Sequence, residues 1–496
     1  MSPPFWRRAL AAMLAGTLLA GTPAAAQLPT LGDTSDMTSS AERKLGERIA
    51  RELYRDPDYI DDPVLVEYVQ AIWQPLLVAA RARGELTSEL DERFAWQVLL
   101  GKDRSINAFA LPGGWLGLHL GLVGATVTRD ELASVLAHEL THVTQRHISR
   151  MVSNEAKQLP WIVAGMLLGA LAASKSPQAG GALMTGSQAL AIQQQLNFSR
   201  DMEREADRIG FGVMSQAGFD PQGFVTMFEK LQQAARLNDN GNYPYLRSHP
   251  MTTERAAEMQ ARQPLTTRAP VQPALEHSLA AARARVISNP SVDAQRAMVA
   301  EPDAAGFAGM SRVRQAAVLY SATFAASRLR DGAAVQRLQA RLEASVAANP
   351  VGQRLARLLG AEIALSQGNT APALQLVDGV ARRPELLLVS QAQVQTGQGA
   401  EAAQRLQTWV ANQPRDAAAW QLLSAAYLAD RQPLRAVRAE AEARVAQLDY
   451  PAALDRLKAA QEMGRRGPGT DHIEASIIDT RTRAVESLLR EQALER

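Results

Sequence analysis

The apolar positions in the first third of the chain follow two different patterns, and each pattern predicts a different kind of element. Over residues 39–83 they recur every three to four positions, which is typical of amphipathic helices. Short apolar runs follow at residues 94–100, 106–111 and 115–122, with a Pro-Gly-Gly turn signal between the last two. We therefore expect helices first and then a small sheet of about three strands.

A helical period returns just after this predicted sheet. Thr128 precedes Glu131 by three positions, which is the spacing of a capping box, and apolar residues then recur at helical spacing. This pattern predicts a helix that begins near Arg129. Helical patterns return over residues 189–216 and 223–236, separated by a Gly-Phe-Asp-Pro break.

Residues 159–173 are apolar throughout, and a Gly- and Ser-rich stretch follows them. The run is shorter than the roughly 20 residues that a membrane-spanning helix needs. It is typical of a buried helix or hairpin of the same domain. The alternative is a flap that covers the substrate or touches a membrane.

The chain after residue 273 is rich in Ala, Leu, Arg and Gln and has regularly spaced breaks. Pro350, Pro384 and Pro414 follow one another at intervals of 34 and 30 residues, which is close to the period of tetratricopeptide helix hairpins. An ordinary Ala-rich helical bundle is the alternative, but the period favours a repeat array. The expected organisation is a first domain over residues 27–262, a linker over 263–273 and repeats over 274–496.

The first residues carry the three-part pattern of a secretory signal peptide. Arg7 and Arg8 precede an apolar run over residues 9–20, and small residues then lead to Ala26. We expect cleavage near Ala26, so that residues 1–26 are the signal peptide and the mature chain is exported. An uncleaved anchor is the alternative, but the apolar run is short for a membrane span.

Composition narrows the candidate chemistry. The chain has 53 basic and 51 acidic side chains, a formal net charge of +2, and this balance indicates no nucleic-acid partner. It contains no cysteine, which excludes disulfides and thiolate metal sites. Any metal ion must therefore be held by His, Asp and Glu.

Two histidines stand four residues apart on the helix predicted from Arg129. At about 100° per residue, His138 and His142 project about 40° apart on one face, with Glu139 beside them. This is the HExxH motif, in which two imidazoles bind zinc and the carboxylate acts on the metal-bound water. Glu139 is then the base that takes a proton as the water attacks a peptide carbonyl.

His147 is the third histidine of the same segment. On a continuous helix it lies about 180° from His138, so it cannot share the same metal ion. We expect a structural role for it, with the side chain packed behind the site helix.

A third ligand must come from elsewhere, and acidic residues at helical spacing are the best candidates. Glu203 and Asp207 are four residues apart and share a helix face, whereas Glu205 lies about 200° from Glu203 and faces away. One carboxylate of the pair can bind zinc while the other orients a ligating imidazole. A solvated acidic face is the alternative, but an HExxH motif without a third ligand favours the metal site.

Three stretches together resemble one known group of enzymes. They are HELTH at residues 138–142, EREAD sixty residues later at 203–207, and SINAFALPGGWLGLHLGLV at 105–123. This combination is similar to the zinc metallopeptidases of the HtpX and CAAX-prenyl-protease superfamily, and the resemblance covers about residues 39–262. It implies a mainly α chain, with a zincin-like α+β metalloprotease domain that has a small sheet, followed by an α-helical array of tetratricopeptide (TPR) type.

The resemblance also implies a set of site residues. One zinc ion is expected on His138, His142 and Glu203, with catalysis by Glu139 and with Asp207 supporting a ligand. The strand at Asn107, Ala108 and Phe109 would line the cleft and pair with an extended substrate. His249, in the sequence Ser-His-Pro, would complete the zinc coordination or stabilise the oxyanion, and an ordinary loop histidine is the alternative.

The exported members with repeats imply a cellular role. They suggest a periplasmic endopeptidase that cleaves misfolded or stalled outer-membrane β-barrel precursors, with the TPR repeats contacting the barrel-assembly machinery. Peripheral membrane contact is a further expectation, and no nucleic-acid partner is expected. The alternative function is a TPR adaptor or chaperone for envelope protein assembly, in which proteolysis is secondary.

Overall fold

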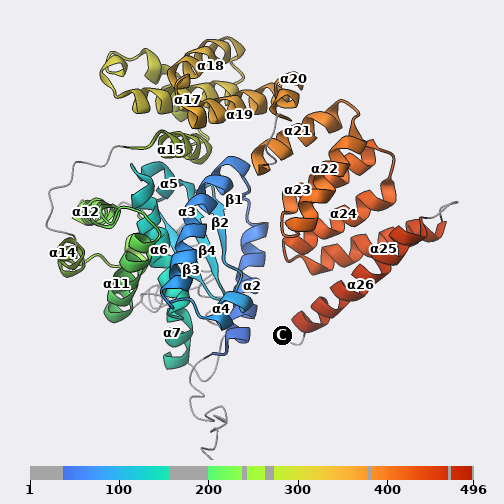
Figure 1. The fold of residues 1–496 in the computed structure, drawn as a ribbon, viewed down its shortest axis with the longest axis horizontal. Coiled ribbons are helices and arrows are strands. Elements are labelled where there is room, and N and C mark those ends of the chain that lie inside the picture. The colour runs from blue at the N-terminus through green and yellow to red at the C-terminus, as the bar shows by residue number, and fades with distance from the viewer. Residues whose placement is uncertain are drawn as a thin grey trace, which may run out of the picture.

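The structure is a computed structural model, and it describes residues 37–155, 199–236, 243–262, 273–377, 382–466 and 471–493. The expected signal peptide at 1–26 and the apolar segment at 159–173 lie outside the described residues, as does nearly all of the expected linker. Within the described residues the chain is mainly helical, with one small sheet near the N-terminus and a helical array in the C-terminal part (Figure 1). The expected fold class is confirmed.

The N-terminal part consists of helices around a four-stranded sheet. Its helices are α2 (Ser39–Arg55), α3 (Pro63–Ala82), α4 (Ser88–Arg93), α5 (Leu120–Ala125), α6 (Arg129–Thr144), α7 (His147–Glu155), α11 (Arg200–Gln216), α12 (Gln222–Arg236), α13 (Tyr245–Ser248) and α14 (Thr253–Ala261). Its strands are β1 (Tyr59–Ile60), β2 (Gln97–Gly101), β3 (Ala108–Leu111) and β4 (Trp115–His119). The strand order is β1-β2-β4-β3, which leaves β3 at an edge.

The sheet differs from the sequence expectation at two places. A short strand, β1, pairs antiparallel with β2 and adds a fourth strand. The apolar run at residues 115–122 ends as a strand at His119, and α5 follows it. Gly121 allows this turn, because a Cβ there would lie 2.1 Å from the carbonyl oxygen of Arg104.

The central helix of the first domain is α6, which begins at Arg129 as its capping signal predicts. The Thr128 hydroxyl accepts a hydrogen bond from the Glu131 N–H at 3.2 Å, and the Glu131 carboxylate accepts one from the Val127 N–H at 2.7 Å. Every residue of α6 from Glu131 to Thr144 is buried. The helix contacts β3 of the sheet, and α3, α11 and α12 also pack against it.

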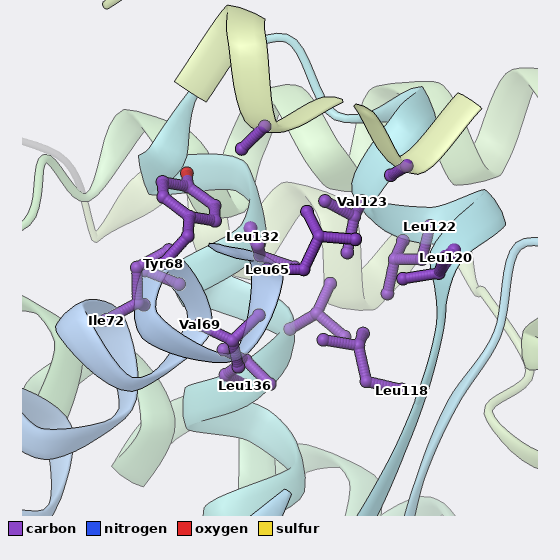
Figure 2. Close-up of a cluster of buried hydrophobic side chains, with 14 of the residues drawn as sticks. Leu65, Tyr68, Val69, Ile72, Leu118, Leu120, Leu122, Val123, Leu132 and Leu136 are labelled. Carbon is purple, nitrogen blue, oxygen red and sulfur yellow. The ribbon is translucent and has the colours of Figure 1, made fainter. Parts of the chain in front are cut away.

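The hydrophobic core fills the space between α3, α5, α6 and the sheet. Figure 2 shows side chains from these elements that meet in one cluster, and the fully buried residues among them include Leu65, Leu118 and Leu132. Helix α3 has the length and hydropathy of a membrane span within the described residues. Its apolar side chains Ile72 and Trp73 are nevertheless buried in this cluster, so it is the core helix of the domain.

The array begins at Leu275. Its helices are α15 (Leu275–Ser288), α16 (Val292–Ala300), α17 (Arg312–Arg328), α18 (Gly332–Val346), α19 (Pro350–Ser366), α20 (Ala371–Leu374), α21 (Arg383–Gln395), α22 (Gly399–Asn412), α23 (Ala417–Ala429), α24 (Pro433–Ala446), α25 (Tyr450–Arg466) and α26 (His472–Ala493), with short 3-10 turns at Glu301–Asp303, Phe307–Gly309 and Gln375–Val377. Pro350 and Pro384 stand in the first turns of their helices, where the missing N–H costs nothing. Gly368 and Gly397 follow helix ends with φ of 80° and 77°, as helix C-termini favour.

The array contacts the first domain at both of its ends. Near its start, Arg283 of α15 is buried and forms an ion pair with Asp62 at 2.6 Å, and Asp62 is also the N-cap of α3. Near its end, one apolar cluster joins Ile49 of α2 to Leu457 and Ile478 of α25 and α26. The array therefore curves around the side of the domain that carries α2 and α3 (Figure 1).

His277 supports the first of these junctions and makes it sensitive to pH. It is buried, its Nδ1 lies 2.5 Å from the Tyr68 hydroxyl, and its Nε2 lies 2.9 Å from the Thr126 carbonyl oxygen. Burial lowers the pKa of His277 from 6.5 to about 4. The unfolded chain therefore takes up a proton as the pH falls through 6.5, and the folded chain resists it until about pH 4, so stability is lost in that window.

Because of His277, we expect the free energy of unfolding to fall by about 2 kcal/mol when the pH is lowered from about 7 to about 5. Urea denaturation of the wild type and of His277→Gln at the two pH values measures this difference, and the variant should lose less stability on acidification. An equal loss in both proteins would contradict the assignment.

Candidate metal centre and catalytic residues

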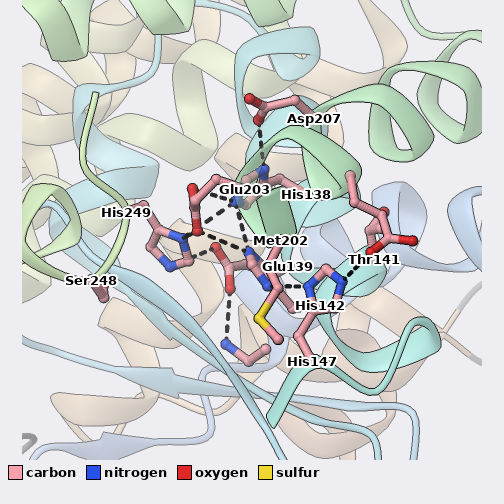
Figure 3. Close-up of polar contacts among 12 residues, drawn as sticks. His138, Glu139, Thr141, His142, His147, Met202, Glu203, Asp207, Ser248 and His249 are labelled. Atoms are coloured by element: carbon pink, nitrogen blue, oxygen red, sulfur yellow. Dashed lines mark hydrogen bonds and ion pairs between the residues drawn. The ribbon is translucent and has the colours of Figure 1, made fainter. Parts of the chain in front are cut away.

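Four buried side chains from three elements converge on one point. His138 and His142 come from α6, Glu203 from the first turn of α11, and His249 from the C-cap of α13. Each offers one potential ligand atom, and these atoms all lie within 4.8 Å of one another. Figure 3 shows the four side chains pointing toward one another.

The separations within this cluster suit a small divalent metal ion. The Nε2 atoms of His138 and His142 are 2.9 Å apart, and His249 Nδ1 lies 3.3 Å from His138 Nε2. Glu203 Oε1 lies 2.9 Å from His249 Nδ1 and 3.5 Å from His142 Nε2. Ligands about 2.0 Å from a tetrahedral metal are about 3.3 Å apart, so the described residues fit such an ion.

Protonation of the cluster also suits a metal ion. Burial, reinforced by the neighbouring His138, keeps the pKa of His142 well below its ordinary value, so the ring is neutral and offers a lone pair. Burial alone would raise the pKa of Glu203, but the charges of His249, His138 and Arg255 hold it below its ordinary value. His142 and Glu203 are therefore held in the forms that bind metals, whereas the carboxylates of Glu139 and Glu203 raise the pKa of His249 against the effect of its burial.

Helix α11 reaches the cluster because it lies close to α6. At Gly210 an added Cβ would be 3.1 Å from the backbone of Ala137, so a larger residue would separate the two helices. One turn before it, Asp207 Oδ1 lies 3.0 Å from His138 Nδ1, on the side of the ring opposite the cluster. The Asp207 carboxylate thus orients the His138 ring.

Arg255 of α14 joins the carboxylates of Asp207 and Glu203. Its guanidinium donates two hydrogen bonds to Asp207, at 2.6 and 2.8 Å, and its Nη1 lies 2.7 Å from Glu203 Oε2. Burial would raise the pKa of Asp207, but these hydrogen bonds hold it below its ordinary value. The sequence pattern alone does not single out Arg255, whose one signal is its place six residues after His249 in the same segment.

Glu139 lies beside the cluster and is held by the edge strand. Its Oε2 accepts a hydrogen bond from the Ala110 N–H at 2.9 Å, and its Oε1 lies 3.4 Å from His249 Nε2. Oε1 is buried, and a hydrogen bond from the Tyr245 side chain to this carboxylate works against the rise of its pKa. Burial raises the pKa of Glu139 above its ordinary value, against the charges of His249 and His138, which makes the carboxylate a stronger base.

Tyr245 is a second residue that the sequence analysis missed. Its ring stacks on the His249 imidazole, with centroids 4.5 Å apart and planes inclined by 24°. Both residues belong to the short helix α13 and its cap, and the Tyr245 N–H lies 3.4 Å from the Ile106 carbonyl oxygen just before β3. Stacking and this backbone contact fix His249 against the cluster.

His147 corrects the sequence-based geometry. Helix α6 ends at Thr144, and Arg146 has a φ of 53°, so His147 begins a new helix and the angle of a continuous helix does not apply. His147 is fully buried, and its Nδ1 lies 2.9 Å from His142 Nδ1. Its Nε2 lies 3.0 Å from Glu205 Oε2, so Glu205, which faces away from Glu203, still contacts the back of the site.

The predicted substrate strand lies next to Glu139. The carbonyl oxygen of Asn107 accepts a hydrogen bond from the His119 N–H at 3.0 Å, so it points into the sheet. Phe109 pairs with Gly117, where an added Cβ would lie 2.0 Å from the Phe109 ring. By the alternation of an antiparallel pair, the backbone groups of Ala108 and Ala110 face away from β4. The outer edge of β3 therefore belongs to these two residues.

Comparisons with known proteins relate this chain to one family. The family model described as Peptidase family M48 matches residues 67–263. The beta-barrel assembly-enhancing protease of Escherichia coli (strain K12) is 30% identical over 443 residues, which cover 86% of each chain. The chain belongs to peptidase family M48.

Two further relatives of this M48 metallopeptidase match over shorter stretches. The putative beta-barrel assembly-enhancing protease of Vibrio cholerae is 33% identical over 275 residues, 55% of this chain and 54% of that protein. The mitochondrial metalloendopeptidase OMA1 of Arabidopsis thaliana is 32% identical over 170 residues, 34% of this chain and 32% of that protein. The match to the Escherichia coli protein extends well beyond the stretch that the family model covers.

Arg255 should contribute strongly to the stability of the metal-free form of this M48 peptidase. Arg255→Met leaves the carboxylates of Asp207 and Glu203 buried without their cation, and we expect a loss of about 3–5 kcal/mol in unfolding free energy. The matched control is Arg262→Met, because Arg262 contacts Glu258 in an exposed pair on the same segment, worth less than about 1 kcal/mol. Urea denaturation of chelator-treated protein compares the two, and equal stabilities would contradict the assignment.

Proposed function

We propose that this chain is a zinc-dependent endopeptidase, with zinc held by His138, His142 and Glu203. The observation that carries the proposal is the convergence of these three side chains beside the carboxylate of Glu139, with a second carboxylate, Asp207, behind one imidazole. Imidazole and carboxylate ligands without cysteine suit zinc in a catalytic site, where one coordination position is left for water.

In this proposal, Glu139 is the general base. When bound, zinc lowers the pKa of its coordinated water to about 7 and polarises the substrate carbonyl. Ala110 holds Oε2 of Glu139 at 2.9 Å, which leaves Oε1 to accept the proton. Glu139 then passes that proton to the departing amine of the cleaved peptide bond.

The substrate would lie along the outer edge of β3. An extended peptide could pair there with the backbone N–H and carbonyl of Ala108 and with the carbonyl of Ala110, because the Ala110 N–H is already bonded to Glu139. Asn107 and Phe109, the other expected residues of this strand, pair with β4 on the inner side. Endopeptidase activity fits this geometry. Strand pairing binds the substrate through its backbone hydrogen-bonding groups, and it does not require a free N- or C-terminus of the peptide near the site.

His249 would act at the metal or at the reacting carbonyl. Its Nδ1, 3.3 Å from His138 Nε2, is placed to complete the zinc coordination in a resting state. Its Nε2, 3.4 Å from Glu139 Oε1, is placed to stabilise an oxyanion if the ring turns toward substrate.

For the cellular role, we propose cleavage of misfolded or stalled outer-membrane β-barrel precursors in the periplasm. The support is the alignment with the Escherichia coli protease named for β-barrel assembly, which covers 86% of this chain. The TPR-type array would recruit substrates or the barrel-assembly machinery, with peripheral contact to the membrane. The second candidate is a TPR adaptor or chaperone with secondary proteolysis, and the length of the array favours it.

Glu139→Gln tests the proposed reaction. The amide cannot accept the proton, so cleavage of an unfolded β-barrel protein should fall by about 10²–10⁴-fold while zinc content stays that of the wild type. Digestion is followed by electrophoresis with and without chelator. Cleavage that resists chelator, or equal activity in the variant, would exclude the metallopeptidase mechanism. If the Glu139→Gln variant suppresses the aggregation of an unfolded β-barrel protein, that result would support the chaperone candidate.

His249→Ala separates the two roles of His249. If the imidazole is a zinc ligand, the variant should lose at least as much zinc affinity as the loss of a residue that only supports a ligand costs, about 10–100-fold. If it stabilises the oxyanion, kcat should fall by about 10²-fold at unchanged zinc affinity. Competition with a chromophoric chelator gives the affinity and steady-state kinetics give kcat. Wild-type values of both would leave His249 as an ordinary loop residue.

A further inference from the structure

A chain of polar contacts leads from the back of His142 to the surface. The His142 and His147 Nδ1 atoms are 2.9 Å apart, and His147 Nε2 lies 3.0 Å from Glu205 Oε2. Arg150 Nη1 donates a hydrogen bond to the same oxygen of Glu205 at 2.9 Å. Figure 3 shows His147 behind His142, on the side away from Glu203 and His249.

The chemistry of these groups sets the direction of every hydrogen bond. An ionised carboxylate only accepts, so His147 must carry its proton on Nε2 to donate to Glu205. A neutral imidazole has one N–H, and His147 Nδ1 is therefore an acceptor. His142 must then carry its proton on Nδ1, which leaves the lone pair of Nε2 directed at His138 and Glu203.

Helix α11 thus orients both imidazoles of α6, one by a direct contact and the other through a third residue. Asp207 contacts His138 Nδ1 directly at 3.0 Å, whereas Glu205 acts on His142 through the ring of His147. Glu205 and Asp207 are two residues apart and leave α11 on different faces. Glu205 is too far around the helix to reach His142, and His147 spans that distance.

The backbone bend that places His147 is held by other parts of the fold. Arg146 adopts a φ of 53°, a conformation that costs a residue with a Cβ about 1 kcal/mol or more. Its side chain donates a hydrogen bond to Glu42 of α2 at 2.8 Å and another to the carbonyl oxygen of Met37. The bend is therefore a specified feature of the structure, and its effect is to turn His147 back toward His142.

We propose that His147 and Glu205 form a positioning dyad that fixes the tautomer and orientation of His142 for metal binding. The proposal rests on the proposed assignment of His142 as a metal ligand. Neither residue of the dyad contacts the metal position or the substrate edge of β3. The dyad acts on the site through His142.

Zinc affinity of the full-length protein, stripped with chelator and titrated with Zn²⁺ against a chromophoric chelator, tests the dyad. His147→Leu removes the acceptor for His142 and should weaken binding by about 10–100-fold, and Glu205→Ala should weaken it by about 10-fold. His147→Asn keeps an acceptor oxygen near the Nδ1 position and should restore most of the affinity. Equal affinities for His147→Leu, Glu205→Ala and the wild type would overturn the proposal.

Two controls match these variants. Arg150→Met removes the ion pair with Glu205 and leaves the contact between Glu205 and His147, so wild-type affinity is expected. Asp201→Asn removes an exposed carboxylate from the first turn of the same helix, four residues before Glu205, and should also bind zinc as the wild type does. A loss in either control as large as in Glu205→Ala would assign the effect to surface charge and overturn the dyad.

The ring tautomer is a readout that a merely structural role would not change. In metal-free protein labelled with ¹⁵N-histidine, NMR should show the wild-type His142 proton on Nδ1, and His147→Leu should shift it partly to Nε2. A wild-type proton on Nε2 would overturn the proposal even if a variant fails to fold. His142→Ala with unchanged zinc affinity would refute the ligand assignment itself, which distinguishes that failure from a failure of the dyad.

Discussion

The rest of the structure depends on the complete burial of α6 around its polar residues. His138, Glu139 and His142 are each at most 1% exposed, in the middle of a helix that also buries the apolar side chains of Leu136 and Leu140. A buried polar group without a partner costs about 1–3 kcal/mol, and a buried charge costs more. Helices α11 and α12 and strand β3 accordingly each supply a hydrogen-bonding or charged partner to α6 as well as apolar surface.

Helix α11 is the main source of these partners. Glu203 faces the cluster, Asp207 faces the back of His138, and Glu205 reaches the back of His142 through His147. The segment that follows α12 supplies the opposing side, because His249 contacts Glu203 and Arg255 forms ion pairs with both Asp207 and Glu203. The candidate site is thus a set of ion pairs and oriented rings that is held in place from several sides, as a preorganised site is.

The array extends this set of contacts to the C-terminal half of the chain. Helix α2 packs against α25 and α26, and Arg51 of α2 donates a hydrogen bond to the Leu448 carbonyl oxygen at 3.0 Å. The same helix carries Glu42, which holds Arg146 at the bend before His147. The C-terminal end of the array, α2 and the bend behind the site are thus in continuous physical contact, while α3 makes the other junction with the array.

The sequence by itself determined the local features of this protein. Thr128 and Glu131 start α6 through hydrogen bonds between near neighbours, and the four-residue spacing of His138 and His142 fixes their common face, because both depend on helix geometry alone. The strand at Ala108–Leu111 followed from a short apolar run before a turn signal, and the helical array followed from the regular spacing of its proline breaks. The place of that strand at the edge of the sheet did not. What tertiary structure decided are the contacts between distant segments. Arg146 bends against α2, so His147 turns toward His142, and Arg255 meets Asp207 because α14 packs beside α11. The local sequence pattern cannot predict either contact, since each depends on how helices that are distant in the sequence pack against one another.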